Sequence, residues 1–90
     1  MTRKVNIVVS GRVQGVYFRA FTRRKAKQLD LVGRATNLAD GRVEIIAQGD
    51  DEAIAQFITW CRKGPITARV DHIDINELPV AEELHSFEIK

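Results

Sequence analysis

The alternation of apolar and polar positions predicts that the chain opens with a strand and continues into a helix. Residues 5–9 place Val5, Ile7 and Val9 on one face of an extended segment. Residues 18–29 repeat apolar or small side chains at intervals of four, four and three, which is one stripe of a helix. The members of this stripe are Phe18, Thr22, Ala26 and Leu29. A strand that leads through a short turn into an amphipathic helix is therefore the first predicted unit.

A hairpin and a second helix follow. Strands are predicted over residues 33–38 and 42–48, and Asp40-Gly41 between them supplies the positive φ that a tight turn needs. Asp50 can cap the next helix, and the two acids after it suit the positive end of the helix dipole. The apolar stripe of this helix consists of Ile54, Phe57, Ile58 and Cys61. Gly64-Pro65 predicts where the helix ends.

The last segments complete a βαββαβ order with a short terminal strand. A strand is predicted over residues 68–75, where Val70 and Ile73 are out of phase and indicate a bulge. A polar connection leads to a final strand over residues 87–89. Right-handed crossovers place both helices on one face of an antiparallel sheet. The pattern predicts one α+β domain over residues 1–90, a ferredoxin-like α/β sandwich with the first and third strands at its centre.

The amino-acid composition limits the compartment and the classes of function that are expected for the protein. The 90 residues are 44% hydrophobic, which suffices for one core. Cys61 is the single cysteine, so an internal disulfide and a cysteine-pair metal site are excluded, and a reduced, cytoplasmic setting is expected. The apolar run of residues 5–9 is too short for a signal peptide or a membrane span. A net charge of +2 does not by itself indicate nucleic-acid binding.

The candidate chemistry lies in the turn between the first strand and the first helix. Gly11 and Gly15 bracket this turn, and Arg19 stands in the first turn of the helix. A helix N-terminus and the amides of a glycine-assisted turn attract anions. A cation in a first helical turn costs about 0.3–1 kcal/mol, and a bound dianion would remove that cost. The segment therefore predicts an oxyanion or phosphate cradle.

Three motifs identify a resemblance to a known family. Residues 11–19, Gly-Arg-Val-Gln-Gly-Val-Tyr-Phe-Arg, resemble the signature of the acylphosphatases, enzymes that hydrolyse carboxylic–phosphoric anhydrides. Residues 37–44 are similar to the second motif of that family, and residues 64–70 to its third landmark. Residues 87–90 fit the usual C-terminal strand. The resemblance covers nearly the whole chain and implies the same ferredoxin-like fold.

The resemblance also implies the roles of individual residues. Arg19 matches the catalytic arginine, whose planar guanidinium can bond two phosphate oxygens. Asn37 matches the asparagine that orients the attacking water. The phosphoryl oxygens would also accept hydrogen bonds from the backbone amides of Gln14, Gly15, Val16, Tyr17 and Phe18. The end of the second strand is expected to approach this loop.

The reaction that the resemblance implies needs few catalytic groups besides these residues. A carboxylate of ordinary pKa, about 4, leaves without a proton donor, and the substrate phosphate can accept the proton of the water. The expected substrate is a small acyl phosphate and the expected products are a carboxylate and inorganic phosphate. No metal, no cofactor, no nucleic acid and no membrane is expected, and the protein is expected to be a monomer.

Three positions depart from the family pattern. Arg34 stands where an aromatic residue is common, and Thr36 precedes the asparagine where a basic residue is usual. Asp30 follows the first helix at a position where glycine is typical, and a left-handed conformation there would cost some stability. These departures affect local stability and the fit of the substrate, and they leave the two catalytic positions unchanged.

Other functions remain open in principle. An RNA-recognition module shares the βαββαβ order, but it stacks bases on aromatic residues of its central strands, and residues 42–48 have none. A metal-carrying ferredoxin-like domain needs paired cysteines. His72 and His85 stand apart from any ligand pattern and are interpreted as surface or edge-strand histidines. A non-catalytic domain that binds anions with the same cradle is separated from an enzyme only by an assay.

Overall fold

A computed structural model describes residues 1–80 and 84–90 of the chain. The elements follow the predicted order and are listed from the N-terminus: β1 Thr2–Arg12, α1 Phe18–Gln28, β2 Val32–Asn37, β3 Val43–Asp50, α2 Asp51–Lys63, β4 Arg69–Leu78 and β5 Phe87–Ile89. Residues 81–83, which belong to the predicted polar connection, lie outside the described residues. Within the described part of the chain, no helix is long and apolar enough to span a membrane.

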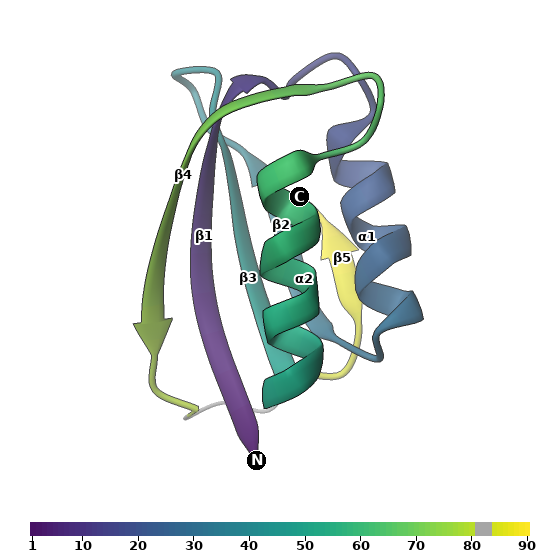
Figure 1. The fold of residues 1–90 in the computed structure, drawn as a ribbon, viewed down its shortest axis with the longest axis vertical. Coiled ribbons are helices and arrows are strands. Elements are labelled where there is room, and N and C mark those ends of the chain that lie inside the picture. The colour runs from purple at the N-terminus through teal and green to yellow at the C-terminus, as the bar shows by residue number, and fades with distance from the viewer. Residues whose placement is uncertain (81–83) are drawn as a thin grey trace.

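The five strands form one sheet in the order β4-β1-β3-β2-β5, so β1 and β3 are central, as predicted. The pairs β1–β3, β1–β4 and β2–β3 are antiparallel. The short β5 pairs with β2 in parallel, which makes the complete sheet mixed. Both helices cover one face of the sheet, and they run in opposite directions along it (Figure 1). This arrangement is the ferredoxin-like α+β sandwich that the pattern predicts.

Strand β1 is longer than its apolar pattern predicts, because its polar ends pair as well as its centre. Its ladder with β3 begins at the pair Thr2↔Asp50 and reaches Val9↔Val43. Its ladder with β4 changes register between Ser10 and Gly11, which confirms the predicted bulge. A Cβ atom on Gly11 would lie 2.2 Å from the carbonyl oxygen of Arg69, so the two strands need glycine at this point.

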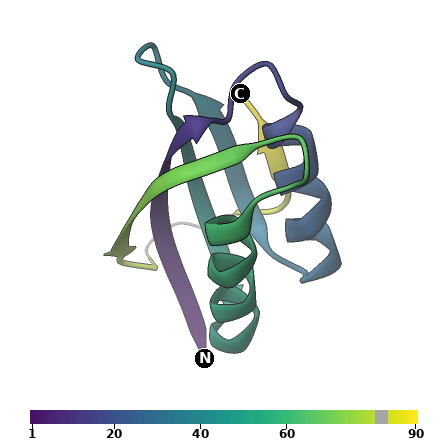
Figure 2. The ribbon, with the colours of Figure 1, turned by 45° about the horizontal axis from the view of Figure 1, so that its top comes forward.

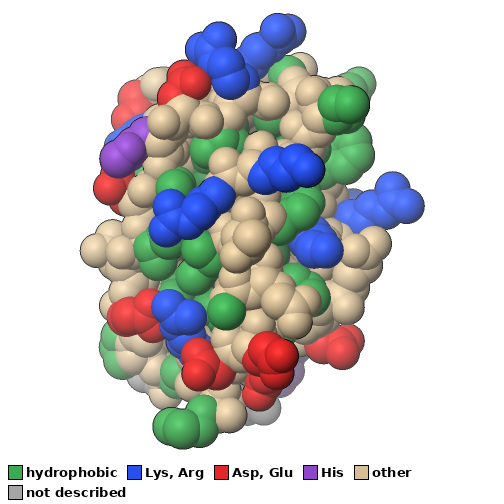
Figure 3. Space-filling view, viewed as in Figure 1, with side chains coloured by type: hydrophobic (Ala, Val, Ile, Leu, Met, Phe, Trp, Pro, Cys, Tyr) green, Lys and Arg blue, Asp and Glu red, His purple; other side chains and the backbone are tan. Residues whose placement is uncertain are grey.

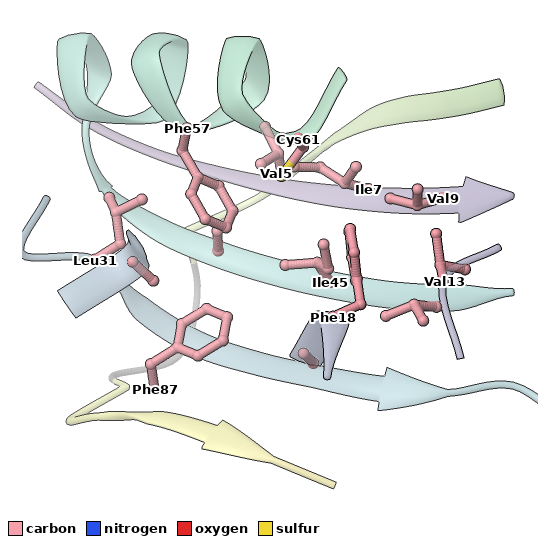
Figure 4. Packing of buried hydrophobic residues seen from close by; sticks show 14 of the residues in the cluster. Val5, Ile7, Val9, Val13, Phe18, Leu31, Ile45, Phe57, Cys61 and Phe87 are labelled. Atoms are coloured by element: carbon pink, nitrogen blue, oxygen red, sulfur yellow. The ribbon is translucent and has the colours of Figure 1, made fainter. Parts of the chain in front are cut away.

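The core lies between the sheet and the two helices (Figure 4). Phe18 from α1 and Phe57 from α2 are fully buried against the inner face of β1 and β3. Thr22 is the one buried polar side chain among the described residues, and its hydroxyl donates to the carbonyl of Phe18 at 2.7 Å. The predicted apolar stripes of both helices therefore face the sheet, and this packing fixes where α1 begins.

The ends of the two helices show a left-handed Asp30 and the predicted Asp50 cap. Asp30 adopts the left-handed conformation, with φ of 57°, directly after α1. The N–H of Asp30 donates to Lys27 at 3.1 Å and the N–H of Leu31 to Ala26 at 2.8 Å, which is the Schellman pattern that usually recruits glycine. At the start of α2, the carboxylate of Asp50 accepts the N–H of Glu52 at 3.3 Å.

Candidate active site

A cleft of about 340 Å³ lies at the end of the sheet where β1 leads into α1. Its lining residues come from the loop after β1, the first turn of α1, and the ends of β2 and β5: Val13, Gln14, Gly15, Tyr17, Phe18, Arg19, Ala20, Asn37 and Ile89. Figure 2 shows the loop, the start of α1 and the C-terminal end at the same end of the molecule. Five of the six predicted cradle residues and Asn37 thus share one cleft; Val16 points into the core.

The loop combines two left-handed residues with the start of a helix. Gly15 has φ of 73°, and Tyr17, the N-cap of α1, has φ of 60° and makes no side-chain capping hydrogen bond. Throughout residues 1–80 and 84–90, no acceptor is found for the backbone N–H groups of residues 14–19. Unpaired amides at a helix N-terminus, preceded by a turn of this kind, can bind an anion through several hydrogen bonds at once.

The loop is anchored to the body of the protein on its apolar side. Val16 is 8% exposed and Phe18 is 1% exposed, whereas Tyr17 between them is 79% exposed. The hydroxyl of Thr67, in the segment before β4, donates to the carbonyl of Val16 at 2.9 Å. The carbonyl of Val16 is therefore held by Thr67, whereas the N–H groups of residues 14–19 have no protein acceptor within the described part of the chain.

Arg19 lies in the first turn of α1 and forms part of the cleft wall. Its Nη1 donates to the backbone carbonyl of Lys90. Lys90 is itself fixed, since its N–H donates to the carbonyl of Ala35 in β2 at 2.8 Å. No Asp or Glu side chain among the described residues pairs with Arg19, and α1 has no acid in its first turn. The guanidinium is thus oriented by the backbone oxygen of Lys90 and not by an acidic side chain.

Asn37 is the last residue of β2 and lies on the face of the sheet that the helices cover. It pairs with Val43 of β3, and two residues earlier Ala35 is buried on the same face. Asn37 itself is exposed because the helical layer does not extend over this end of the strand. The register therefore brings its side chain to the cleft that Gln14 and Arg19 also line.

Three side-chain contacts at the site were not predicted from the sequence. They are the hydrogen bonds of the Gln14 side chain to the β2–β3 hairpin, of Thr67 to Val16, and of Arg19 to Lys90. Each joins residues at least 24 positions apart in the chain, so local patterns carry no signal for it. Thr67 does lie within the third motif, which is the one indication that the sequence offers.

The charged and reactive groups elsewhere keep the ordinary roles expected from the sequence. His72 lies 3.1 Å from Asp74 on the exposed strand β4, away from the cleft. Burial raises the pKa of the Cys61 thiol well above its usual range. No group of three or more His, Cys, Asp or Glu side chains gathers in the described residues. In the view of Figure 3, Lys and Arg side chains lie over the middle and the upper end of the visible face, and acidic ones lie near its lower end and along its upper left edge.

Comparison with known proteins agrees with this geometry. The family model for acylphosphatase matches residues 5–89. An acylphosphatase of Methylococcus capsulatus is 46% identical over 87 residues, which cover 97% of this chain and 95% of that protein. The crystal structure of an acylphosphatase from Bacillus subtilis superposes with a TM-score of 0.94 at 38% identity, covering 100% of this chain and 99% of that one.

A second solved acylphosphatase, from Coxiella burnetii, has a TM-score of 0.92 at 36% identity and covers 99% of this chain and 93% of its own. Fold and cleft define a ferredoxin-like α+β domain with a candidate site at one end of its sheet. The chain belongs to the acylphosphatase family. It is therefore a hydrolase, and acyl phosphates are the substrates of its reaction.

Proposed function

We propose that the loop of residues 14–18 and Arg19 hold the phosphoryl group of an acyl phosphate while Asn37 positions the attacking water. The observation that carries the proposal is the set of consecutive N–H groups, residues 14–19, that lack a protein acceptor beside the Arg19 guanidinium. Donors fixed in advance around a developing negative charge stabilise a transition state without reorganisation. Phosphoryl transfer depends chiefly on such positioning and charge stabilisation.

Arg19 supplies the positive charge of the site. Its bond to the Lys90 carbonyl uses one of the five guanidinium N–H groups, so the others can reach two phosphate oxygens. A phosphoryl group would relieve the unfavourable placement of this cation at a helix N-terminus. The start of α1 and Arg19 would then act together, with the dipole and the guanidinium directed at the same anion.

Asn37 would place the water opposite the leaving carboxylate. The water oxygen forms the new bond to phosphorus, and the bond between phosphorus and the acyl oxygen breaks with its electron pair on the carboxylate. The proton of the water goes to a phosphoryl oxygen. A carboxylate with an ordinary pKa of about 4 is a good leaving group at neutral pH, so no general acid is required. Inorganic phosphate is the second product.

We also propose the setting in which residues 1–90 act. A reduced cytoplasm suits a chain whose single cysteine is a buried thiol of raised pKa, unsuited to disulfide exchange. The site would work without metal or cofactor, since Arg19 and the amides supply the positive field. The domain would act as a monomer, because every proposed site residue comes from one chain.

Hydrolysis of a small aromatic acyl phosphate by point variants tests the proposal. Arg19→Ala should abolish turnover in a folded protein and weaken phosphate binding by about 1.5–3 kcal/mol. Arg23→Ala is the matched control, because Arg23 is an exposed arginine one turn further along α1. Near-normal turnover of a folded Arg19→Ala protein would end the assignment.

Asn37→Ala separates water positioning from substrate binding. A group that acts mainly in the transition state lowers kcat and leaves phosphate affinity nearly unchanged when it is removed. Steady-state kinetics and calorimetric titration with inorganic phosphate measure the two quantities. Normal kcat combined with weakened phosphate binding would make Asn37 a binding residue and leave the reaction without its proposed water ligand.

A further inference from the structure

The side chain of Gln14 joins the cradle loop to the β2–β3 hairpin. Its Nε2 donates to the carbonyl of Leu38 at 2.8 Å and to the carbonyl of Arg42 at 2.9 Å. Both partners are acceptors, so only the NH₂ group of the amide can occupy this place. Both of its N–H groups are used, and they bridge residues 24 and 28 positions away in the sequence.

The two carbonyls close the base of the hairpin. The N–H of Leu38 donates to Arg42 at 2.8 Å, and the N–H of Gly41 donates to Leu38 at 3.2 Å. Asp40 adds stiffness, since its carboxylate accepts from the backbone N–H and from Nε of Arg42. The exposed tip projects from the body of the protein (Figure 2). The hairpin end is therefore braced by its own hydrogen bonds, and the Gln14 side chain is attached at its base.

Asn37 immediately precedes this base. Two constraints fix where its side chain stands relative to the loop: the β2–β3 ladder, through the pair Asn37↔Val43, and the Gln14 bridge one residue further on. Within residues 1–80 and 84–90, no hydrogen bond other than those of Gln14 joins residues 13–17 to residues 38–42.

We infer that the Gln14 side chain is a positioning residue that sets the distance between the phosphate cradle and Asn37. The inference rests on the proposed function, because it assigns Asn37 to the water. Gln14 has two separable parts in this scheme: its backbone N–H belongs to the cradle, and its side chain holds the hairpin. Removing only the side-chain donors should therefore misplace Asn37 and leave the cradle intact.

Gln14→Met is the most selective substitution, since it keeps an unbranched side chain of similar length and removes both N–H donors of the side-chain amide. The fold should survive it, because the carbonyls of Leu38 and Arg42 keep their backbone partners. We expect kcat to fall by about tenfold to a hundredfold, the scale of a displacement of about 1 Å at a catalytic group. The dissociation constant of inorganic phosphate should change by less than about twofold, because the cradle amides are untouched.

Thr67→Val is the matched control. It also deletes one side-chain hydrogen bond to a backbone carbonyl beside the cleft, but Thr67 holds Val16 and is not bonded to the hairpin. Each variant is measured alone and combined with Asn37→Ala. The effects of two substitutions are not additive when both residues act through one group, whereas the effects of independent substitutions are additive. Gln14→Met should thus lower kcat by less than about twofold further in the Asn37→Ala background, and Thr67→Val should retain its full effect there.

Full additivity of Gln14→Met and Asn37→Ala would overturn the inference while leaving the proposed function in place. A parallel loss of phosphate affinity in Gln14→Met would overturn it as well. Unchanged kcat in Asn37→Ala alone would remove the proposed water ligand, and this inference with it. Hydrogen exchange gives a readout independent of turnover: the Leu38 amide should lose protection in Gln14→Met and keep it in Thr67→Val, and equal protection in both would contradict the bridge.

Discussion

Helices α1 and α2 pack on the same face of one sheet, yet they begin in opposite ways. α2 has Asp50 as a capping side chain, acids in its first turn and basic residues in its last turn. α1 has a left-handed Tyr17 at its N-cap, no capping side chain, no acid in its first turn and Arg19 there instead. The helices run antiparallel, so these two starts lie at opposite ends of the molecule (Figure 1).

The two helix starts therefore differ in whether side chains of the same helix cap and balance the positive end of the dipole. The positive end of the α2 dipole is balanced by its own residues. At α1 the same positive end adjoins a cleft, amides without a protein acceptor and an arginine, so the helix dipole, the N–H groups and the guanidinium all favour the binding of an anion. The start of α2 is stabilised by its own side chains. We expect the start of α1 to be stabilised instead by a bound anion.

Inorganic phosphate should therefore stabilise the protein through α1. Binding to the native state alone contributes about 2.7 kcal/mol at about a hundredfold excess over Kd. In a domain of this size, such a gain raises Tm by very roughly 10–20 °C. Thermal melting over a phosphate titration measures the effect, which should saturate at low concentration.

Two variants serve as controls for this titration. Phosphate also stabilises proteins in general by exclusion from their surface, without saturation. Asp50→Ala alters the start of α2 and should keep the saturable shift, whereas Arg19→Ala should retain only the general effect. Identical, non-saturating shifts in the parent and in Arg19→Ala would mean that residues 11–19 are only a turn.

Asp50→Ala should lower the free energy of unfolding by about 0.5–2 kcal/mol, the usual effect of losing an N-cap side chain. The cause is the loss of its bond to the Glu52 N–H. Activity per folded molecule should be unchanged, because the start of α2 lies far from the cleft. Chemical denaturation and steady-state hydrolysis check both parts, and a large loss of activity would show that the two helix starts are not independent.

Tyr17→Gly should make the start of α1 slightly more stable. A side chain in the left-handed region costs about 1–2 kcal/mol, and glycine gives back about 0.5–1 kcal/mol of this through its entropy. Little burial is lost, since Tyr17 is 79% exposed. A gain below about 1 kcal/mol in denaturant unfolding is the expected result; a clear loss would indicate that the Tyr17 ring makes contacts that matter.

Excess chelator should change nothing. We expect no requirement for a divalent ion, because the helix N-terminus and Arg19 would supply the positive charge. Hydrolysis rates with and without chelator should agree within error, and the same should hold for Asp50→Ala. Activity that disappears in chelator and returns with a divalent cation would contradict the scheme.

Local features of the fold were predictable, because each depends on neighbours in the sequence. The Asp50 cap and the apolar stripe that carries Phe57 follow from spacing alone, and the out-of-phase pair Val70 and Ile73 indicated the bulge. The left-handed conformation of Asp30 was considered only as a condition, because glycine is typical of that position in the family. The family motifs led to the residues that line the cleft, although their roles stay predictions.

Distant contacts were not predictable in the same way. The parallel pairing of β5 with β2 depends on which sheet edge is free. The full length of β1 depends on hydrogen bonds of its polar ends. The side-chain bonds of Gln14 and the orientation of Arg19 by Lys90 join segments that meet only in the folded chain. A glutamine in a loop has no pattern that reveals its partner.

Gly11 and Gly15, the two glycines between β1 and α1 that bracket the turn, differ in the side chains that they can tolerate. A Cβ on Gly11 would collide with the Arg69 carbonyl at 2.2 Å, whereas a Cβ on Gly15 would meet nothing within 4 Å. Gly15 needs only a positive φ, which asparagine and aspartate also adopt. In a library with both codons randomised and selected for folding, position 11 should return glycine alone, and position 15 should drift among glycine, asparagine and aspartate.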